Sequence, residues 1–340
     1  MGEKKPGQYM ISEIMEQPDA IRRTLSEAQE EAREVALAIM NRFVYTTGSG
    51  SSYHASLVLG RTLMRISGSR VISIPASELP DWLPSDLSDS ALVAFSQSGE
   101  SKDVLTAVDS FRKLGPGSPV VAVTNTPEST LTMVSDHIIL TRAGVERAVA
   151  ATKTYTAQLA VSFVLSLELA LLNGRKVEPL VKELWTIPGK VRGSIEMSRS
   201  PARDLARRLY KRPVGFVLGR GPNYPTALEA ALKLRETSNL HYVGYAAREF
   251  LHGPIQLVDR GTPVIFLGWR ENEEVVRRVS SLGGDPVLVG EEGDIILPST
   301  NYEFTPILMV VPMQLLSYEV SILRGLDPDK PEKLSKVVRE

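Results

Sequence analysis

The most informative segment of the chain is Ala91-Leu92-Val93-Ala94-Phe95-Ser96-Gln97-Ser98-Gly99-Glu100-Ser101. Its first five residues are apolar and predict a buried strand, and residues 104–114 predict a helix. Hydroxyls and a glycine between a strand and a helix leave backbone N–H groups unpaired at the positive end of the helix dipole, where anions bind. No Gly-Lys-Ser/Thr follows, so the loop is not a Walker A motif. The segment predicts a phosphate cradle of neutral donors; the alternative is an ordinary capped turn.

Strand-like and helix-like segments alternate on both sides of this loop. In the first half of the chain, apolar runs predict strands at residues 44–46, 71–74, 91–95, 119–124 and 138–140. In the second half, they predict strands at residues 214–218, 264–267 and 286–289. Helical patterns lie between these runs, and such alternation favours an α/β fold with a parallel sheet that is covered on both faces.

The two halves repeat this architecture, so we expect two tandem α/β domains. The predicted divisions are an N-terminal helical segment (1–30), a first domain (31–178), a helical linker (179–200), a second domain (201–322) and a C-terminal tail (323–340).

Composition limits the classes of protein to which the chain can belong. Its net charge is −1, with no basic patch for nucleic acid or a membrane surface. No uninterrupted apolar run reaches the roughly 18 residues of a membrane span, and no secretory signal precedes the first helix. The lack of cysteine excludes disulfides and thiolate ligands, and the four histidines form no metal-binding pair. We therefore expect a cytoplasmic protein that uses no metal or other cofactor and binds neither nucleic acid nor membrane.

A charged stripe is expected on an otherwise apolar helix in the second half. Glu229, Lys233 and Glu236 are spaced i, i+4 and i+7, so they share one helix face. A glutamate beside a lysine in a partly dry site is a tunable proton shuttle; the alternative is a buried structural ion-pair ladder. His252 precedes Gly-Pro in a loop-like segment, and a histidine there could act as an acid or base near neutral pH.

Ordered motifs along nearly the whole chain carry a resemblance to a known family. They are Glu16-Gln-Pro-Asp-Ala-Ile, Gly50-Ser-Ser-Tyr-His-Ala, Ser96-Gln-Ser-Gly-Glu-Ser, Ala150-Ala-Thr-Lys-Thr-Tyr-Thr, Leu232-Lys-Leu-Arg-Glu, Glu249-Phe-Leu-His-Gly-Pro and Asp327-Pro-Asp-Lys-Pro-Glu-Lys-Leu-Ser-Lys. With them the chain resembles the sugar-isomerase (SIS) family, and in particular the isomerase half of glutamine–fructose-6-phosphate amidotransferase. The resemblance implies two tandem SIS domains, each a parallel-sheet αβα sandwich, followed by a C-terminal tail that belongs to the active site.

The resemblance also implies roles for individual residues. The residues implied to bind the substrate, the first four of them at the sugar phosphate, are Ser96, Gln97, Ser98, Ser101, Ser51 and Ser52. The residues implied to be catalytic are Glu236, Lys233, His252 and Lys336. Glu236 would move a proton between C1 and C2 of the sugar, and Lys233 would hold charge beside it. His252 would open the sugar ring from a neighbouring subunit, and Lys336 would form a Schiff base with the ketose or orient the open chain.

Three departures from the family pattern bear on the substrate more than on the reaction class. Ser101 replaces a Thr, which keeps the hydroxyl, Ala151 stands where Ser is common, and Ala148 replaces a Gly. The change at Ala151 removes one polar contact to the sugar that the resemblance would otherwise imply.

A larger departure concerns the source of nitrogen. The amidotransferase uses a glutaminase domain with a cysteine nucleophile, whereas this chain has no cysteine and begins in the isomerase region. The chain therefore also resembles the stand-alone archaeal-type glucosamine-6-phosphate deaminases, whose C-terminal pattern is similar to Arg324-Gly-Leu-Asp-Pro-Asp-Lys-Pro. The expected ligand is a hexose or hexosamine 6-phosphate, and the expected assembly is a homodimer with shared active sites.

Three functional hypotheses follow. The first is a deaminating isomerase that converts glucosamine 6-phosphate to fructose 6-phosphate and ammonia. The second is the isomerase component of glucosamine-6-phosphate synthesis, served by a separate glutaminase, or another amino-sugar phosphate isomerase or deglycase. The third is a non-catalytic sensor of sugar phosphates.

Overall fold

The computed structural model describes residues 5–336 and divides them into two compact units. Unit 1 comprises residues 5–16, 147–152 and 189–336, and unit 2 comprises residues 17–146 and 153–188. The parts of the predicted N-terminal segment and C-terminal tail that fall on residues 1–4 and 337–340 lie outside the described residues. The domain boundaries expected from the sequence stay predictions.

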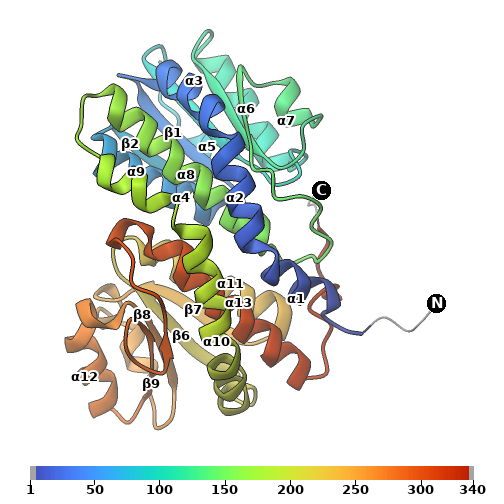
Figure 1. The fold of residues 1–340 in the computed structure, drawn as a ribbon, viewed down its shortest axis with the longest axis vertical. Helices are drawn as coiled ribbons and strands as arrows, with labels where there is room; N and C mark the ends of the chain where they lie inside the picture. The colour runs from blue at the N-terminus through green and yellow to red at the C-terminus, as the bar shows by residue number, and fades with distance from the viewer. Residues whose placement is uncertain (1–4, 337–340) are drawn as a thin grey trace. The chain divides into compact units, whose positions relative to one another are not determined.

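Unit 2 contains a parallel five-stranded sheet (Figure 1). Its strands are β1 (Phe43–Gly48), β2 (Val71–Pro75), β3 (Ser90–Phe95), β4 (Val120–Thr124) and β5 (His137–Leu140). They lie in the order β2-β1-β3-β4-β5, so the chain forms β2 on one side of β1 and then crosses to form β3 on the other. The carboxyl ends of β1 and β3 therefore flank a topological switch point, where open α/β sheets bind their ligands.

Helices cover both faces of this sheet. They are α2 (Gln17–Glu27), α3 (Gln29–Ile39), α4 (Ser51–Thr62), the π-helix η1 (Leu63–Ser67), α5 (Leu79–Trp82), α6 (Lys102–Leu114), α7 (Thr130–Met133), α8 (Lys153–Leu172) and α9 (Glu178–Leu184). Leu92 and Ala94 of β3 share a buried core with Phe111 of α6. Val93 points to the opposite face because strand side chains alternate, and on that side α4 and α8 pack against the strands and each other. This is the predicted αβα sandwich.

Unit 1 contains a second parallel five-stranded sheet with the same switch in strand order. Its strands are β6 (Val214–Gly219), β7 (His241–Ala246), β8 (Pro263–Leu267), β9 (Asp285–Gly290) and β10 (Ile295–Ile296), in the order β10-β9-β8-β6-β7. The two edge strands, β7 and β10, were not among the strands expected from the sequence. β7 contains Gly244 and is mostly half-buried, and β10 has two residues, so neither has the apolar run of a central strand.

The helices of unit 1 complete the second sandwich. They are α1 (Gln8–Met15), α10 (Ile187–Leu209, nearly all of it in this unit), α11 (Asn223–Ser238), α12 (Glu273–Ser281), α13 (Thr305–Leu323) and four 3₁₀ turns, η2 (Glu249–Leu251), η3 (Pro254–Leu257), η4 (Trp269–Asn272) and η5 (Tyr302–Phe304). α11 packs against β6, β7 and α13, while Val275 and Val279 of α12 share a core with Phe266 of β8. The predicted fold class, two α/β units of similar architecture, is confirmed.

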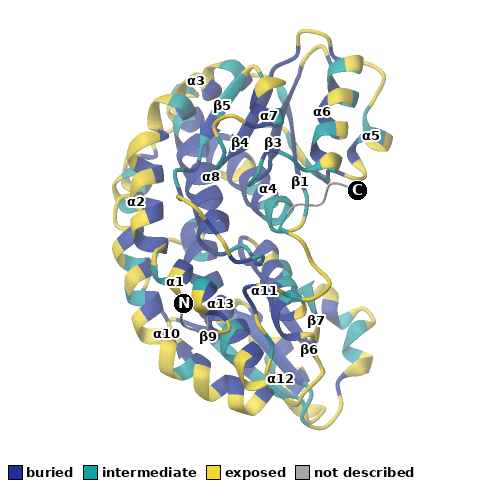
Figure 2. Ribbon diagram, turned by 90° about the vertical axis from the view of Figure 1, so that its right-hand side faces the viewer, coloured by how far each residue is buried: buried dark blue, intermediate teal, exposed yellow. Residues whose placement is uncertain are grey.

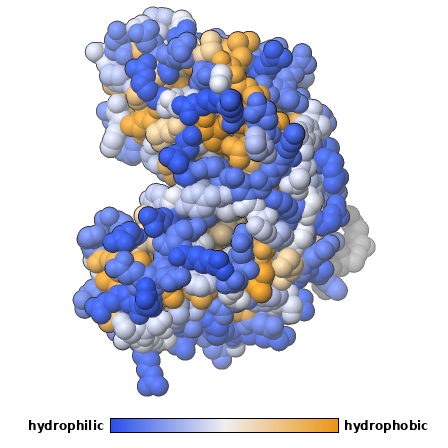
Figure 3. All heavy atoms as spheres, turned by 60° about the vertical axis from the view of Figure 1, so that its left-hand side comes forward, coloured by the Kyte–Doolittle hydropathy of each residue, from blue (hydrophilic) through white to orange (hydrophobic). Residues whose placement is uncertain are grey.

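Two helices of the described chain are long and apolar enough, by length and composition alone, to span a membrane. They are α8, with a mean hydropathy of 1.6, and the segment Tyr302–Leu323 that contains α13. However, 83% and 78% of their apolar windows are buried inside the protein, as in core helices of globular folds. Figure 2 shows α8 largely buried, with exposed residues along α2 and α10. Figure 3 shows one face of the molecule, which is mainly hydrophilic with hydrophobic residues among the hydrophilic ones. The sequence did not predict α8 as a candidate span, because polar residues such as Glu168 interrupt its apolar run.

Candidate functional site

The loop that follows β3 lies at the switch point of unit 2. β1 and β3 pair in parallel, with Gly48 opposite Phe95, so the loops that leave their carboxyl ends emerge at the same edge of the sheet. The first of these loops leads to Ser51 and Ser52 at the start of α4, and the second contains Ser96 to Ser101. The sheet therefore brings together the six residues expected to bind a sugar phosphate.

Hydrogen bonds within the loop fix its shape. The Gly99 N–H donates to Ser96 Oγ at 3.1 Å, and the Glu100 N–H donates to Ser98 Oγ at 3.2 Å. Gly99 has a φ of +69°, and a Cβ there would lie 2.0 Å from Ser129 Oγ. A glycine is therefore required by both the left-handed backbone and the close approach of Ser129.

Glu100 anchors the loop from outside. Its carboxylate accepts hydrogen bonds from the Thr130 N–H and from Thr130 Oγ1, both at 2.8 Å. The negative charge is thus directed toward the start of α7 rather than left without partners in the loop. This role of Glu100 was not expected from the sequence, although an acid in the middle of a serine-rich turn is a signal for it.

Several backbone donors of the loop have no acceptor. Within residues 5–336, the N–H groups of Gln97, Ser98 and Ser101 donate to no protein atom. Ser101 is the N-cap of α6 but makes no side-chain capping hydrogen bond. Unpaired donors at a helix start attract an anion, so the local geometry suits the predicted phosphate cradle.

Ser52 is held in place by α8, and Gln97 borders a pocket. Gln158 of α8 donates from Nε2 to Ser52 Oγ at 3.0 Å, a contact that the sequence did not predict. The pocket has a volume of about 550 Å³, and Asn125, Thr126 and Arg142 also line it. Unit 2 therefore offers space for a ligand beside the loop.

The charged stripe on α11 is present in unit 1 as an ion-paired triad. Lys233 Nζ lies 2.5 Å from Glu236 Oε2 and 3.4 Å from Glu229 Oε1. The Lys233 and Glu229 side chains are 1% and 0% exposed, whereas Glu236 is 22% exposed. The buried ammonium ion is compensated by two carboxylates, and Glu236 is the member of the triad that solvent, and hence a ligand, can reach. This arrangement suits a proton shuttle whose charge is held by its neighbour.

Lys336 is the last described residue and is half-buried. Its Nζ donates to the carbonyl oxygen of Ala148 at 2.6 Å, within unit 1. The tail therefore docks on the segment 147–152, which also contains Ala151.

His252 stands apart from the other predicted residues. It is exposed, follows η2, and precedes Gly253, whose φ is +140°. In the described chain its ring makes no hydrogen bond or ion pair with another predicted site residue. No group of three or more His, Asp or Glu side chains among residues 5–336 is placed to hold a metal ion.

Comparisons with known proteins place the chain in one family. The model of the SIS domain matches residues 40–167 and 208–323. Glutamine–fructose-6-phosphate aminotransferase (isomerizing) from Pyrobaculum aerophilum is 40% identical over 97% of this chain. The chain spans 57% of the length of that relative.

Solved structures agree with the family match. The C-terminal domain of glucosamine-fructose-6-phosphate aminotransferase from Francisella tularensis superposes with a TM-score of 0.87 and 27% identity, covering 94% of this chain and 98% of that one. Glucosamine-6-phosphate deaminase from Thermotoga maritima superposes with a TM-score of 0.82 and 27% identity, covering 97% and 99%. With both of its sheets matched by the SIS model, the chain belongs to the SIS-domain family.

Proposed function

We propose that the chain is the isomerase component of glucosamine-6-phosphate formation. It would take fructose 6-phosphate and ammonia and release glucosamine 6-phosphate and water. The observation that carries this proposal is the buried Lys233–Glu236 pair, with its carboxylate at the accessible end. The name and the 40% identity of the Pyrobaculum aerophilum relative support it.

The proposed chemistry needs a proton shuttle more than any other group. Ammonia condenses with the C2 carbonyl of the open ketose, and water leaves. Glu236 then removes a proton from C1 of the C2 imine and returns it to C2, while the hydroxyl proton on O1 passes to the nitrogen, which leaves an aldehyde at C1 and the amine on C2. Because the proton is returned, the carboxylate ends the cycle as it began.

The remaining predicted residues have separate roles in this proposal. The cradle residues Ser96, Gln97, Ser98 and Ser101 hold the phosphate, and Ser51 and Ser52 contact the sugar. Lys233 holds positive charge beside Glu236. Lys336 orients the open chain or forms a Schiff base with the ketose, and His252 opens the ring.

The reverse reaction is the second candidate: glucosamine 6-phosphate and water would give fructose 6-phosphate and ammonia. One specific observation favours it. The match to the Thermotoga maritima deaminase covers 99% of that chain, against 57% of the Pyrobaculum aerophilum relative. The same Glu236 chemistry serves both directions, and the two candidates differ in which direction the protein serves.

One assay separates the candidates. The purified chain is incubated with fructose 6-phosphate and ammonium chloride, and in parallel with glucosamine 6-phosphate alone, and both sugars are measured by mass spectrometry. We expect glucosamine 6-phosphate in the first reaction and, because a catalyst accelerates both directions, ammonia in the second. A low KM for glucosamine 6-phosphate together with no saturation by ammonium would favour the deaminase. Binding of sugar phosphate without turnover in either direction would contradict both and support a sensor.

The nitrogen donor is tested in the same assay. Glutamine should not replace ammonium, because the chain has no cysteine to act as the nucleophile of a glutaminase. A separate glutaminase is the proposed partner. Production of glucosamine 6-phosphate from glutamine by this chain alone would remove the need for one.

We further propose a homodimer in which His252 completes the site of the neighbouring subunit. Its exposure on a loop suits such a role. Glu236→Gln and His252→Ala proteins, each inactive alone, are mixed under conditions that allow exchange. Mixed dimers would carry one intact site each, so roughly a quarter of wild-type activity should return. If exchange is verified and no activity returns, His252 acts within its own chain.

A further inference from the structure

The carboxylates of the C-terminal tail cap the first helix of unit 1. Asp329 Oδ2 accepts a hydrogen bond from the Tyr9 N–H at 2.9 Å, and Oδ1 accepts one from the Met10 N–H at 2.7 Å. Asp327 Oδ1 accepts one from the Gly7 N–H at 2.9 Å. Gly7 is the N-cap of α1 and has no side chain to cap the helix, so the tail supplies the acceptors that the first turn requires.

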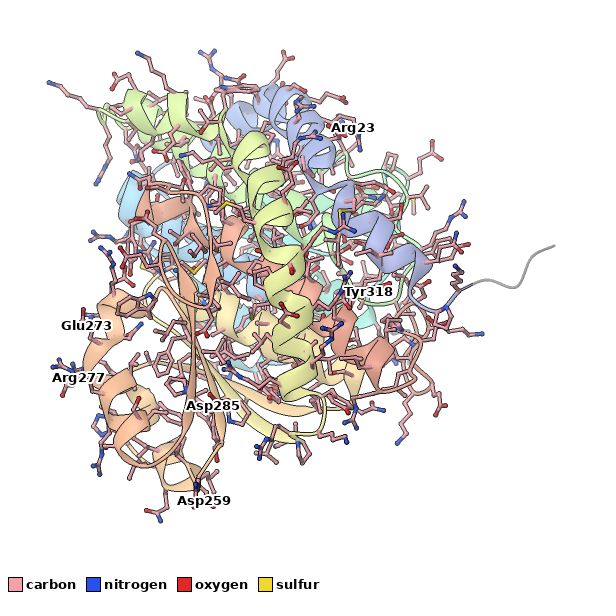
Figure 4. All side chains as sticks on the ribbon, turned by 60° about the horizontal axis from the view of Figure 1, so that its bottom comes forward. Arg23, Asp259, Glu273, Arg277, Asp285 and Tyr318 are labelled. Carbon is pink, nitrogen blue, oxygen red and sulfur yellow. The ribbon has the colours of Figure 1, made fainter. Side chains whose placement is uncertain are left out.

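Gly7 is itself tightly enclosed. It has a φ of +74°, and a Cβ there would lie 2.6 Å from a ring carbon of Tyr318 on α13. Figure 4 labels Tyr318 on this helix. The close packing fixes the start of α1 against α13, so the helix is a firm support for the tail.

The other end of α1 holds the segment that Lys336 contacts. Glu13, which is 4% exposed, accepts hydrogen bonds from the Arg147 N–H at 2.5 Å and the Ala148 N–H at 3.3 Å. The Val149 N–H donates to the Asp329 carbonyl oxygen at 3.0 Å. Lys336 Nζ then donates to the Ala148 carbonyl oxygen.

These contacts form a closed ring of interactions, which we call the tail clasp. Asp329 binds the start of α1, and Glu13 of the same helix binds Arg147 and Ala148. Ala148 in turn binds Lys336, which the tail connects back to Asp329. The two carboxylates of the tail clasp are almost fully buried, Asp329 being 7% exposed. Hydrogen bonds to buried carboxylates are stronger than those between neutral groups, so each link restrains the next.

We infer that Asp329 and Glu13 are positioning residues for Lys336, a role that rests on the proposed function of Lys336 in the isomerase reaction. Lys336 lies seven residues beyond Asp329, and a long side chain at the end of a tail has many conformations. Asp329 fixes the course of the tail, and Glu13 fixes the carbonyl that receives the Lys336 amine. A reacting group held in place gains rate, so loosening either support lowers turnover rather than substrate binding.

The test is a double-mutant cycle. Asp329→Asn keeps the shape of the side chain but removes its charge. We expect kcat to fall about 10-fold with KM unchanged, and Asp329→Asn to cause less than a twofold further loss in a Lys336→Met background. Glu332→Gln, which alters an exposed carboxylate of the same tail, is the matched control and should keep kcat within twofold. An equal loss from Asp329→Asn in both backgrounds would overturn the inference, because the residue would then act without Lys336.

A chemical measurement tests the same contact without activity. Lys336 is labelled with acetic anhydride under limiting conditions, and exposed Lys333 is the internal reference. We expect Asp329→Asn, and Glu13→Gln likewise, to raise the labelling rate of Lys336 several-fold relative to Lys333. If the wild type proves inactive but labelling changes in this way, the positioning contact stands and only the proposed function fails. Unchanged labelling in both variants would overturn the inference itself.

Discussion

The two sheets have equivalent switch points but carry different side chains at them. In unit 2 the loop after β3 presents Ser96, Gln97 and Ser98 around a left-handed Gly99. In unit 1 the loop after β8 also contains a left-handed glycine, but it is the first residue, Gly268 at φ +70°, and Trp-Arg-Glu follows it. Each loop follows the strand that is third in chain order within its sheet, β3 or β8. That strand lies next to the switch point in both sheets.

The chemistry of the second loop does not suit an anion. The Trp269 indole N–H is already bonded to the Glu292 carbonyl at 2.8 Å, and Arg220 donates to the carbonyl of Glu271 at 3.0 Å. Partial burial raises the pKa of the Glu271 carboxyl above its usual range. The pocket beside this loop has a volume of about 240 Å³, less than half of that beside Gln97. Both units have an equivalent sheet edge, and the side chains of the unit 2 loop are the ones that fit the predicted cradle.

The ion-paired triad of unit 1 does not lie in the loop after β8 but on α11, the helix that follows β6. α11 corresponds in order to α4 of unit 2, yet only α11 carries a buried lysine between two glutamates. Under the proposed function, two units of similar architecture would divide the work, with substrate binding in unit 2 and proton transfer in unit 1.

The largest expected effect is on stability, through Lys233. Lys233→Met removes the charge that compensates buried Glu229, and breaking a buried pair in this way costs roughly 3 kcal/mol, about 10²-fold in the folding equilibrium. Lys102→Met, at the exposed start of α6 beside the cradle, should change stability by less than about 0.5 kcal/mol. Thermal unfolding monitored by circular dichroism measures both. Equal melting temperatures for the two variants would show that the triad adds no stability.

Glu236→Gln is expected to have the next largest effect. An amide cannot accept the proton at neutral pH, so kcat should fall about 10²-fold or more while KM changes little. Arg235→Gln on the exposed side of the same helix should leave kcat within twofold. Steady-state isomerase kinetics measure both constants. Near-normal turnover in Glu236→Gln would show that the triad has a structural role and not a catalytic one.

The two left-handed glycines offer a matched pair. Gly99→Ala forces a Cβ against Ser129 and disturbs the cradle, so KM for the sugar phosphate should rise about 10-fold or more. Gly268→Ala introduces similar backbone strain, with its Cβ 2.9 Å from Glu271 Oε2, but should leave KM unchanged. Both variants are checked by thermal unfolding first. A similar rise in KM from Gly268→Ala would mean that the second loop also contributes to binding.

The smallest effect concerns the hydroxyl at position 101. Ser101→Ala should raise KM about fivefold, as expected for the loss of one hydrogen bond among several. Ser101→Thr keeps the hydroxyl and should stay within twofold of the wild type. If the two variants behave alike, the Ser101 hydroxyl does not contact the substrate.

The sequence predicted the central strands and the charged stripe of α11 because each depends on neighbours along the chain. The apolar run 91–95 marks β3, and the spacing of Lys233 and Glu236 places them on one helix face. β7 was missed because an edge strand is only partly buried, so its residues do not form an apolar run. The roles of Glu13 and Asp329 could not be predicted, because their partners lie 134 to 320 residues away. His252 and the shared-site assembly stay predictions.

The capping of α1 by Asp329 has a consequence for the order of biosynthesis. The Met10 N–H and its acceptor are 319 residues apart, so the first helix emerges from the ribosome long before the residue that caps it. At about 5–20 residues per second, this delay is roughly 15–60 s. During that time Met10 and Ile14, which are fully buried in the finished protein, lack their final environment. α1 is thus made long before the residue that caps it, and its apolar residues stay without that support until the tail has been synthesised.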